Sequence, residues 1–531
     1  MSSSMEAQVV PDFEATPCCD AVTGKVLRES PVHTREELKE AIEAGRRAQA
    51  TWAAMPVKER VKRMLPIRDY MMAHLDELAE TVARDVGKTR IDALVSEIVP
   101  ATMALTYYCG KSKGYLKPRR MMPGSIFFGN KWSRMYRVPF GVIGIISPWN
   151  YPFSIPFSEV VMGLLAGNAV ILKTAGETQA VGLALKECIE AADLPKGLFS
   201  FINMDGPVAG DAFLELGVDK LFFTGSVRVG KILMKKAAES LTPVSLELGG
   251  NDAMLVCEDA DLHRAVNGAV WAGLQNAGQS CGGVERVYVH ASVYDPFMTL
   301  LKKKVESLRV GYDRDHTIDI GAIATGRQFE TVTRHVEDAV AKGATIYAQA
   351  KLPKDPQQGY FYAPTVLTNV DHDMVVMAEE TFGPVLGVMK VNSMEEALNL
   401  ANDSDLGLTG SVWSKNRKQA EALGRRIMAG AITINDHLMS HGLPETPWGG
   451  FKESGIGRSH GAIGFAEMTE SQVVVQDMMP FVKKNLWWHP FSPRVYNTIK
   501  GVALTLYGKD WKEKAKGFGD ILKGFPRMFM K

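Results

Sequence analysis

The chain has 531 residues, of which 46% are apolar and 23% are charged. This length exceeds what a single hydrophobic core organises, so we expect two or three domains. The 61 basic and 60 acidic side chains give a net charge of +1, which argues against a nucleic-acid binder. The charge is uneven, because residues 483–531 carry 11 basic and 3 acidic side chains while the rest carries 50 and 57.

The six cysteines show neither metal-ligand spacing nor a regular framework of pairs, so we predict no metal site and a reducing cytoplasmic location. Residues 1–6 lack a basic stretch followed by an apolar one, and no signal peptide is expected. Residues 138–172 are nearly free of charge, but Pro148, Pro152 and Pro156 would break a membrane-spanning helix. The sequence therefore predicts a soluble protein.

Residues 1–33 are expected to be irregular. Thr34 and Glu37 have the spacing of a capping box, and apolar residues recur at helical intervals from Leu38 to Trp52. A second helix should follow Pro56, with a kink near Pro66, and more helix is expected to about Tyr108.

From Val138 onward, short apolar runs alternate with amphipathic helices. Strands are expected at 142–147, 169–173, 198–203, 220–224 and 244–246, and helices near 155–166, 179–192, 207–217 and 227–239. Buried strands separated by helices predict a parallel, doubly wound α/β sheet, which binds ligands at the carboxyl ends of its strands. A second alternating unit begins with strands at 253–257 and 286–290 and extends to about residue 434.

A lone cysteine, Cys281, lies among small residues in the stretch from Leu274 to Gly283. Taken alone, it is best interpreted as a small buried hydrophobe. Three further stretches change this interpretation. They are Ser147-Pro148-Trp149-Asn150-Tyr151-Pro152, Phe223-Thr224-Gly225-Ser226-Val227-Arg228-Val229-Gly230 and Leu246-Glu247-Leu248-Gly249-Gly250. Together, the four stretches resemble the NAD(P)-dependent aldehyde dehydrogenase superfamily over about residues 20–480.

The resemblance implies a Rossmann-like cofactor domain, an α/β catalytic domain and a β-arm for oligomerisation. We place the cofactor domain at 1–121 and 141–247, the catalytic domain at 248–435, the arm at 122–140 and 459–482, and a basic amphipathic tail at 483–531. The resemblance also implies a homodimer or homotetramer.

Three residues are predicted to carry the chemistry. Cys281 would attack the aldehyde carbon, and the thioester left after hydride transfer would be hydrolysed. The Asn150 amide, with the backbone N–H of Cys281, would stabilise the oxyanion, although Asn also suits a simple turn between prolines. Glu247, in an otherwise apolar run, would activate water, the alternative being a structurally paired carboxylate.

Gly225, Ser226 and Gly230 follow a predicted strand and open a helix, whose free N–H groups suit a pyrophosphate. By resemblance, five more residues contact the coenzyme: Lys173 and Gly206 near the adenosine, Trp149 along its path, and Glu380 with Phe382 at the nicotinamide. Lys173 could equally be a solvated strand end and Phe382 a core residue. The carboxylate that relatives carry after Lys173 for the ribose 2′-hydroxyl is either displaced to Glu177 or replaced by Gly176, so NAD or NADP is predicted, with NAD slightly preferred.

In the tail, Tyr496, Ile499, Val502, Ala503, Leu506 and Tyr507 share one helical face amid interspersed lysines. Such a helix docks on a neighbouring subunit, which we favour slightly, or makes peripheral contact with an anionic membrane. Phe157, Trp271, Ser280 and the segment 437–440 are expected to form the substrate entrance. Because no arginine is placed for a substrate carboxylate, an apolar aldehyde, medium- or long-chain or aromatic, is favoured.

Three competing functions remain. A CoA-acylating dehydrogenase uses the same thiol, but it needs no water-activating base such as Glu247. A catalytically silent binding protein would not need Cys281, Glu247 and Asn150 together. An acyl-transferring thioesterase-like enzyme would leave the phosphate-binding helix start at Gly225 unexplained.

Overall fold

The computed structural model describes residues 14–353 and 358–530. Contacts divide the chain into a larger unit, residues 1–115 and 139–470, and a smaller unit, residues 116–138 and 471–531. The arm expected at 122–140 and 459–482 differs from this division, because residues 459–470 belong to the larger unit. The expected catalytic domain lies within the larger unit, and so does the expected cofactor domain except for residues 116–121, which belong to the smaller unit.

The N-terminal segment is more regular than its sequence suggested. Strands β1 (Ala15–Cys19) and β2 (Val26–Pro31) pair in an antiparallel ladder with a bulge at Cys18 and Cys19. The prediction of irregular structure is wrong for these strands, which were missed because they lack a regular apolar alternation; residues 1–13 lie outside the described chain. Helix α1 (Arg35–Ala54) confirms the capping box between Thr34 and Glu37.

The helical region continues through α2 (Val57–Ala73), which contains Pro66, α3 (Leu75–Val86) and α4 (Arg90–Ala93). A π-helical turn, η1 (Leu94–Ile98), then leads into α5 (Val99–Leu116). Such π turns occur mostly inside α-helices and often at functional sites.

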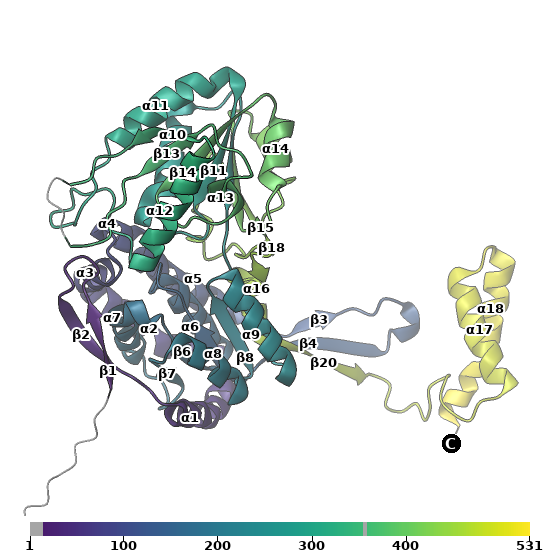
Figure 1. The fold of residues 1–531 in the computed structure, drawn as a ribbon. Helices are drawn as coiled ribbons and strands as arrows, with labels where there is room; N and C mark the ends of the chain where they lie inside the picture. Colours follow the sequence, from purple (N-terminus) through teal and green to yellow (C-terminus); the bar gives the residue numbers. More distant parts are fainter. Residues whose placement is uncertain (1–13, 354–357, 531) are drawn as a thin grey trace, which may run out of the picture. The chain divides into compact units, whose positions relative to one another are not determined.

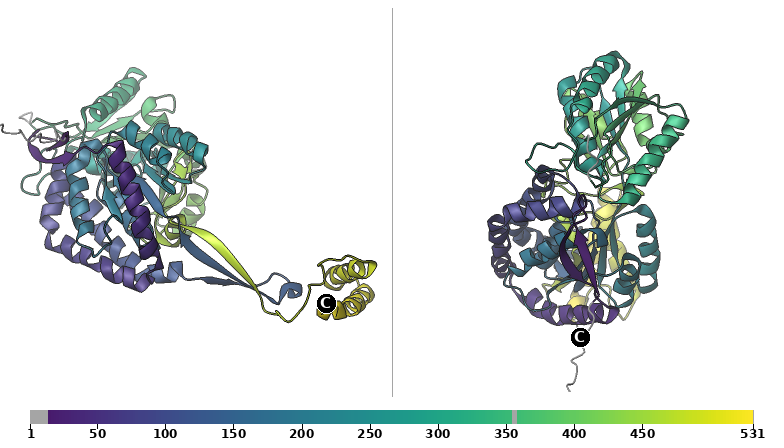
Figure 2. Two further views of the ribbon diagram at one scale, coloured as in Figure 1. Left: turned by 90° about the horizontal axis from the view of Figure 1, so that it is seen from below. Right: turned by 60° about the vertical axis from the view of Figure 1, so that its left-hand side comes forward.

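The first sheet has the order β19-β9-β8-β5-β6-β7, and all its strands except β19 run parallel. Helices α1, α8 and α9 cover one face and α2, α6 and α7 the other (Figures 1 and 2). The chain starts at central β5, builds one side and then crosses to the other, so the carboxyl end of β5 is a topological switch point. The bounds are β5 (Val142–Ile146), β6 (Ala169–Lys173), β7 (Phe199–Phe201), β8 (Lys220–Thr224), β9 (Val244–Glu247), β19 (Gly455–Ile456), α6 (Ser154–Ala166), α7 (Gln179–Glu190), α8 (Gly206–Glu215) and α9 (Val227–Ser240).

The second sheet has the order β12-β13-β14-β11-β10-β16-β17, and only β12 runs antiparallel to its neighbour. Its bounds are β10 (Asp252–Val256), β11 (Val284–His290), β12 (Thr345–Gln349), β13 (Thr365–Thr368), β14 (Val385–Val391), β16 (Thr409–Trp413) and β17 (Ala431–Ile434). The helices are α10 (Leu262–Leu274), α11 (Tyr294–Glu306), α12 (Gly326–Ala341), α13 (Val375–Ala378), α14 (Met394–Asn402) and α15 (Arg417–Gly424). The short elements β15 (Leu406–Gly407), β18 (Phe451–Lys452) and α16 (Gly461–Glu467) complete the unit. The doubly wound α/β prediction is confirmed.

The smaller unit contains a three-stranded sheet and a pair of helices. The sheet has the order β20-β4-β3, with β3 (Arg119–Met121), β4 (Lys131–Pro139) and β20 (Thr469–Asp477). The pair is α17 (Pro493–Tyr507) and α18 (Trp511–Gly524), followed by a 3₁₀ turn at Phe525–Phe529. We expected only the first helix, because Gly517 and Gly519 lower the helix propensity of the second. None of the described helices is long and apolar enough to cross a membrane.

Candidate active site

The loop that carries Cys281 has an unusual backbone. Asn276 and Ala277 are left-handed, with φ of 52° and 53°, and Gly278 follows with φ of 73°. Non-glycine residues in this region cost on the order of 1 kcal/mol each, so surrounding contacts must hold them there. A Cβ on Gly278 would collide with the carbonyl of Gly383. The loop is therefore fixed before β11, with Cys281 half-buried at its end.

Asn150 contacts this loop directly. It follows the central strand β5, is buried, and its side-chain amide donates to the carbonyl oxygen of Gln279 at 3.1 Å. The backbone carbonyl of Asn150 accepts from Lys88 at 2.8 Å and from the Asn276 side chain at 3.1 Å. The structure thus brings Asn150 and the Cys281 loop together, as the oxyanion hypothesis requires.

A buried ion pair supports this arrangement from behind. Lys88 lies 2.6 Å from Glu97, which sits on the π-helical turn, and Glu97 also accepts from the backbone N–H of Phe153 at 2.8 Å. Our sequence analysis missed Lys88 and Glu97. Both residues lie in a region whose sequence predicts helix, and that pattern does not indicate that they are buried.

Glu247 ends strand β9 and is buried, and its Oε2 atom has no hydrogen-bond partner. Burial, together with the nearby carboxylate of Glu159, raises its pKa well above the usual value. Glu247 and Cys281 line one small cavity of about 20 Å³. A carboxylate with a raised pKa beside a nucleophile is the combination that a general base needs.

The thiol of Cys281 also has a raised pKa. The first cause is burial, and the negative charges of Glu380, Asp252 and Glu247 add to it. These causes favour the protonated thiol over the thiolate. Nucleophilic attack from this arrangement therefore requires that a neighbouring base accept the thiol proton.

A second cavity, of about 220 Å³, opens from Cys281 to the surface. None of the described residues that line it is Lys, Arg, Asp or Glu, and burial lowers the pKa of its one histidine, His441, to about 4. Its apolar lining includes Val95, Val99, Met103, Trp271, Leu438 and Met439. Trp271, Ser280, Leu438 and Met439 were expected at the entrance and do line this cavity.

Three expected entrance residues lie elsewhere. Phe157 is fully buried and stacks on Phe153, with ring centroids 5.4 Å apart. His437 is buried behind the nucleophile loop, where its ring lies 3.1 Å from the Gly282 carbonyl. Ser440 is absent from the lining. Their positions follow from tertiary packing, which the sequence around these residues does not reveal.

The residues expected to hold the coenzyme phosphates surround the carboxyl ends of β6 and β8. Ser226 caps α9 by accepting from the Val229 N–H, and Gly225 donates its N–H to the backbone carbonyl of Glu247 at 3.0 Å. A Cβ on Gly230 would lie 2.7 Å from Cδ2 of Leu248, so the end of that side chain would have to shift. Lys173 is buried at the end of β6, and a Cβ on Gly206 would lie 3.9 Å from its ammonium nitrogen.

The residues expected near the nicotinamide also meet. The rings of Trp149 and Phe382 pack edge to face at 5.5 Å, and Phe382 has a left-handed φ of 52°. Buried Glu285, which our sequence analysis missed, accepts from the Phe382 N–H at 2.8 Å and from the Thr381 N–H at 2.9 Å. Glu380 accepts from the Gly250 N–H at 3.1 Å. This set suits a coenzyme chemically, because a dinucleotide offers a pyrophosphate to helix N–H groups and flat rings to aromatic side chains.

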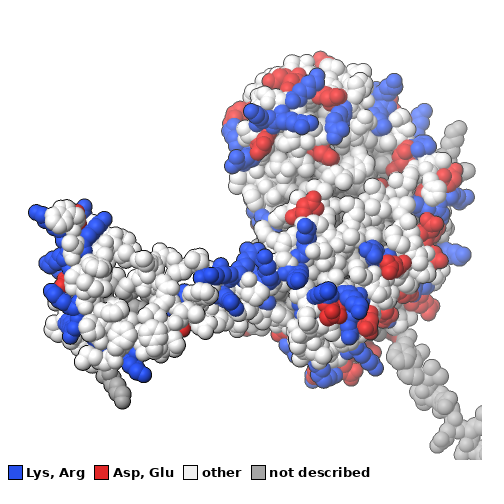
Figure 3. Space-filling view, turned by 180° about the vertical axis from the view of Figure 1, so that it is seen from behind, with Lys and Arg blue, Asp and Glu red and all other residues white. Residues whose placement is uncertain are grey.

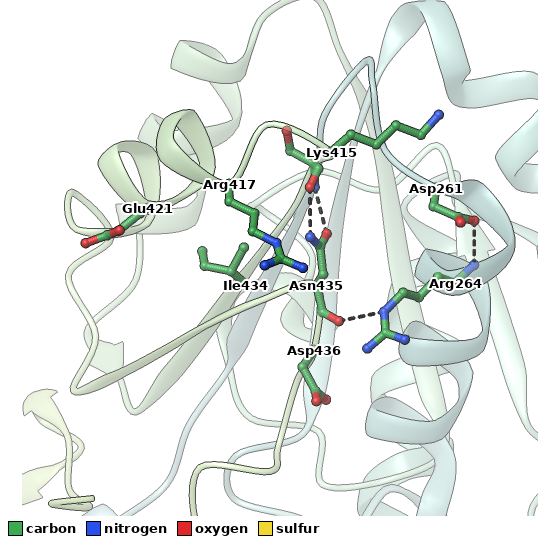
Figure 4. A pocket seen from close by; sticks show the side chains of 9 residues that line it. Asp261, Arg264, Lys415, Arg417, Glu421, Ile434, Asn435 and Asp436 are labelled. Carbon is green, nitrogen blue, oxygen red and sulfur yellow. Dashed lines mark hydrogen bonds between the residues drawn. The ribbon is translucent and has the colours of Figure 1, made fainter.

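A third, more open pocket, of about 770 Å³, is lined by Arg264, Lys415, Arg417 and Asn435 among others (Figure 4). The Asn435 side chain bonds to the backbone of Ser414, and its carbonyl accepts from Arg264 at 3.0 Å. Cys281 is not among the residues of this pocket. Asn435 therefore has a structural role at the end of β17.

The sequence profile of the aldehyde dehydrogenase family matches residues 10–474. The chain belongs to the aldehyde dehydrogenase family. It is 39% identical over 489 residues to a 4,4'-diapolycopene aldehyde oxidase from Methylomonas sp., covering 92% of this chain and 90% of the relative. It is 38% identical to a putative NADP⁺ succinate-semialdehyde dehydrogenase from Mycolicibacterium smegmatis, covering 91% and 94%.

Solved structures agree with this assignment. An NAD-dependent aldehyde dehydrogenase from Sinorhizobium meliloti superposes with a TM-score of 0.84 at 32% identity, covering 90% of this chain and 93% of that one. The NAD⁺ complex of an aldehyde dehydrogenase from Bacillus cereus has a TM-score of 0.83 at 31% identity, covering 88% and 94%. This aldehyde dehydrogenase thus has the fold, as well as the sequence, of its family.

Proposed function

We propose that this aldehyde dehydrogenase oxidises an apolar aldehyde to the free carboxylic acid, with Cys281 as nucleophile, Asn150 as oxyanion donor and Glu247 as general base. NAD or NADP would be held by Lys173, Gly206, Gly225, Ser226, Gly230, Trp149, Glu380 and Phe382. The bound coenzyme supplies a hydride acceptor. The observation that carries the proposal is the uncharged cavity that ends at Cys281.

The reaction begins when a neighbouring base accepts the thiol proton of Cys281 and the sulfur attacks the aldehyde carbon. The Asn150 amide, already directed at the nucleophile loop, stabilises the resulting oxyanion. After hydride loss, a thioester joins the acyl group to Cys281. Glu247 then takes a proton from water as the water oxygen attacks the thioester carbonyl, and the carbon–sulfur bond breaks to release the acid.

The cavity lining favours apolar substrates. Each buried CH₂ contributes about 0.8 kcal/mol, so kcat/KM should rise about fourfold per carbon until the cavity is full. A semialdehyde acid would bring a carboxylate into a lining without a described cation, which is costly. Although a mycobacterial relative carries succinate semialdehyde in its name, this lining supports an apolar aldehyde here.

The test is coenzyme reduction at 340 nm with butanal, hexanal, octanal, benzaldehyde and succinate semialdehyde, for the native protein and C281A. We expect activity that rises with chain length and vanishes in C281A. Preference for succinate semialdehyde would refute the apolar assignment, and activity retained in C281A would refute the mechanism. Acyl-CoA as the product when CoA is added would favour the CoA-acylating alternative.

The assembly and location are also proposals. Val473, Val474 and Val475 on strand β20 are each about half exposed, and such an apolar stretch is a ready surface for pairing with another chain. This supports a homodimer or homotetramer, measurable by light scattering. Peripheral membrane contact of a cytoplasmic enzyme through residues 483–531 would suit an apolar substrate.

A further inference from the structure

The helix pair α17 and α18 is held together by glycines. A Cβ on Gly501 would lie 2.5 Å from the carbonyl oxygen of Gly517, and one on Gly517 would lie 2.5 Å from that of Gly501. Gly524 meets Thr498 as closely. The two backbones therefore touch along a stripe of small residues, which leaves little room for large apolar side chains between the helices.

Many large apolar side chains of the pair consequently face outward, although Val495 is buried. Tyr507 is 79% exposed and Trp511 74%. Tyr496, Phe518, Leu522, Phe525 and Phe529 are also exposed. A helix pair in water normally turns its apolar stripe inward. This pair instead has small residues between its helices and large apolar residues on its outer surface, as helices that pack in lipid do.

Basic side chains flank these apolar residues. Residues 483–531 carry 11 Lys and Arg against 3 Asp and Glu. In the space-filling view, the Lys and Arg of the described tail residues lie along the margins of the helix pair and leave a broad face without charge (Figure 3). Lys512, Lys514 and Lys516 lie on the first turns of α18, and all three are exposed. An apolar aromatic face with a basic rim matches the interface of a bilayer that contains anionic lipids.

We propose that the pair α17–α18 is an interfacial membrane-binding element whose aromatic face enters the headgroup region of an anionic lipid surface. The element lies on the membrane without crossing it, because its helices have 15 and 14 residues and a spanning helix needs about 20. The basic rim supplies the charge complementarity that selects anionic lipid. Residues 1–482 carry 50 basic and 57 acidic side chains, so docking on a second copy of this chain is the alternative that the test has to distinguish.

The test uses the full-length chain and sedimentation with vesicles of phosphatidylcholine alone or with 30% phosphatidylglycerol. K512Q/K514Q/K516Q removes three rim charges, and Y507S/W511S/F518S removes the aromatic face. K302Q/K303Q/K304Q is the matched control, because it removes three exposed lysines from α11 of the larger unit. Unchanged circular dichroism verifies that each variant is folded.

We expect binding to the anionic vesicles that weakens as salt rises. Each lysine contributes about fivefold near such a surface, so the α18 lysine variant should bind up to about a hundredfold more weakly while the control binds normally. The aromatic variant should also bind the anionic vesicles more weakly than the native chain. Equal binding by the α18 lysine variant and the control, or no vesicle binding by the native chain, would overturn the proposal. Loss of oligomer mass in the aromatic variant without vesicle binding would assign the face to a neighbouring subunit instead.

One consequence of this membrane binding rests on the proposed function: the helix pair would bring the enzyme to a membrane that holds its apolar aldehyde. Vesicle binding is measured without substrate, so its failure leaves the proposed reaction untouched. If the reaction itself fails, binding to vesicles still stands.

A different observation concerns the small cavity beside Cys281. Its volume of about 20 Å³ suits one water molecule, and its lining includes Glu159, Glu247 and His460. Glu159 Oε2, Glu247 Oε2 and His460 Nδ1 are all buried without a hydrogen-bond partner. Three such atoms around a space of this size require an explanation, because unpaired buried polar groups are costly.

We infer that Glu159 is a positioning residue that receives, through a water in this cavity, the proton that Glu247 takes from the attacking water. The proton moves from Glu247 to the cavity water as another leaves that water for Glu159, so no charge or electron is gained. Glu159 lies on α6, and it was not among the expected site residues. Burial raises its pKa to about 8, which suits a group that alternates between acid and base.

Other titratable groups line this cavity or lie close to those that do. His441 and His460 lie with ring centroids 4.9 Å apart, and burial lowers the pKa of both. The Tyr108 ring packs near His460. Arg458 favours the charged form of Glu247, whereas Glu467, itself bonded to Lys220, disfavours it. Among the described residues that line the cavity, Glu159 is the one carboxylate besides Glu247.

This second inference rests on the proposed function, and E159Q tests it by separating two phases of the reaction. The first burst of coenzyme reduction should be unchanged, and the later turnover should fall about tenfold. The apparent pKa of that turnover should also decrease, because a like charge near Glu247 is removed. An unchanged pKa with reduced stability would mean a merely structural role, and a slower burst would place Glu159 in acylation. Absence of any burst in the native enzyme would instead contradict the proposed function itself.

Discussion

The ammonium group of Lys88 lies 2.6 Å from the carboxylate of Glu97, and neither side chain reaches solvent. This pair holds the backbone on both sides of the oxyanion donor, since Lys88 binds the Asn150 carbonyl and Glu97 binds the Phe153 N–H. The position of Asn150 thus depends on two residues that are remote from it in sequence.

Breaking this pair should cost both stability and activity. E97Q leaves a buried cation without its partner, so we expect the free energy of unfolding to fall by about 3–5 kcal/mol. Displacement of Asn150 should lower kcat up to about a hundredfold. Urea denaturation and steady-state kinetics measure the two effects.

The matched control is E187Q, which breaks the exposed pair between Arg28 and Glu187. Pairs of this kind contribute about 0–1 kcal/mol, so this variant should retain both stability and activity. Equal effects of E97Q and E187Q would contradict the positioning role of the buried pair.

Replacement of Glu247 should separate acylation from hydrolysis. In E247Q we expect a burst of about one reduced coenzyme per subunit, followed by turnover reduced about 10²–10⁴-fold, because the base is lost and the nucleophile remains. Rapid-mixing absorbance at 340 nm measures both phases. The native enzyme should turn over faster as pH rises through the elevated pKa of Glu247, since only the carboxylate acts as base. Loss of the burst would assign Glu247 to activation of the thiol instead.

The coenzyme preference should depend on Gly176. A Cβ built there meets no atom within 4 Å, so a larger side chain fits without displacing its neighbours. In G176E, the new carboxylate would repel a 2′-phosphate near Lys173 by about 1–2 kcal/mol. We therefore expect the ratio of kcat/KM for NAD to that for NADP to rise about tenfold. G176A is the control, and an equal change in both variants would exclude charge as the cause.

The sequence predicted the doubly wound sheets because each buried strand is a short apolar run between helices. It also predicted Asn150, Glu247 and Cys281, which the structure brings together, because each lies in a local motif. It failed for Lys88, Glu97, Glu159 and Glu285, since their burial is created by segments distant in sequence. The second helix of the tail was missed for another reason: its glycines are poor helix formers, and one of them, Gly517, serves close packing against Gly501.

Asp85 should make stability depend on pH. It is buried in α3, where it accepts from the Val181 N–H, and burial raises its pKa from 3.8 to about 7. Because the folded state holds this proton more tightly, the contribution of Asp85 to stability is complete below pH 4 and is lost as pH rises through 7. D85N has no carboxyl to titrate, so it should lose less stability than the native chain between pH 4 and 7, by up to about 4 kcal/mol. Urea denaturation across this range measures the difference, with D193N as an exposed control. Parallel pH profiles for native protein and D85N would show that Asp85 is charged in the folded protein throughout.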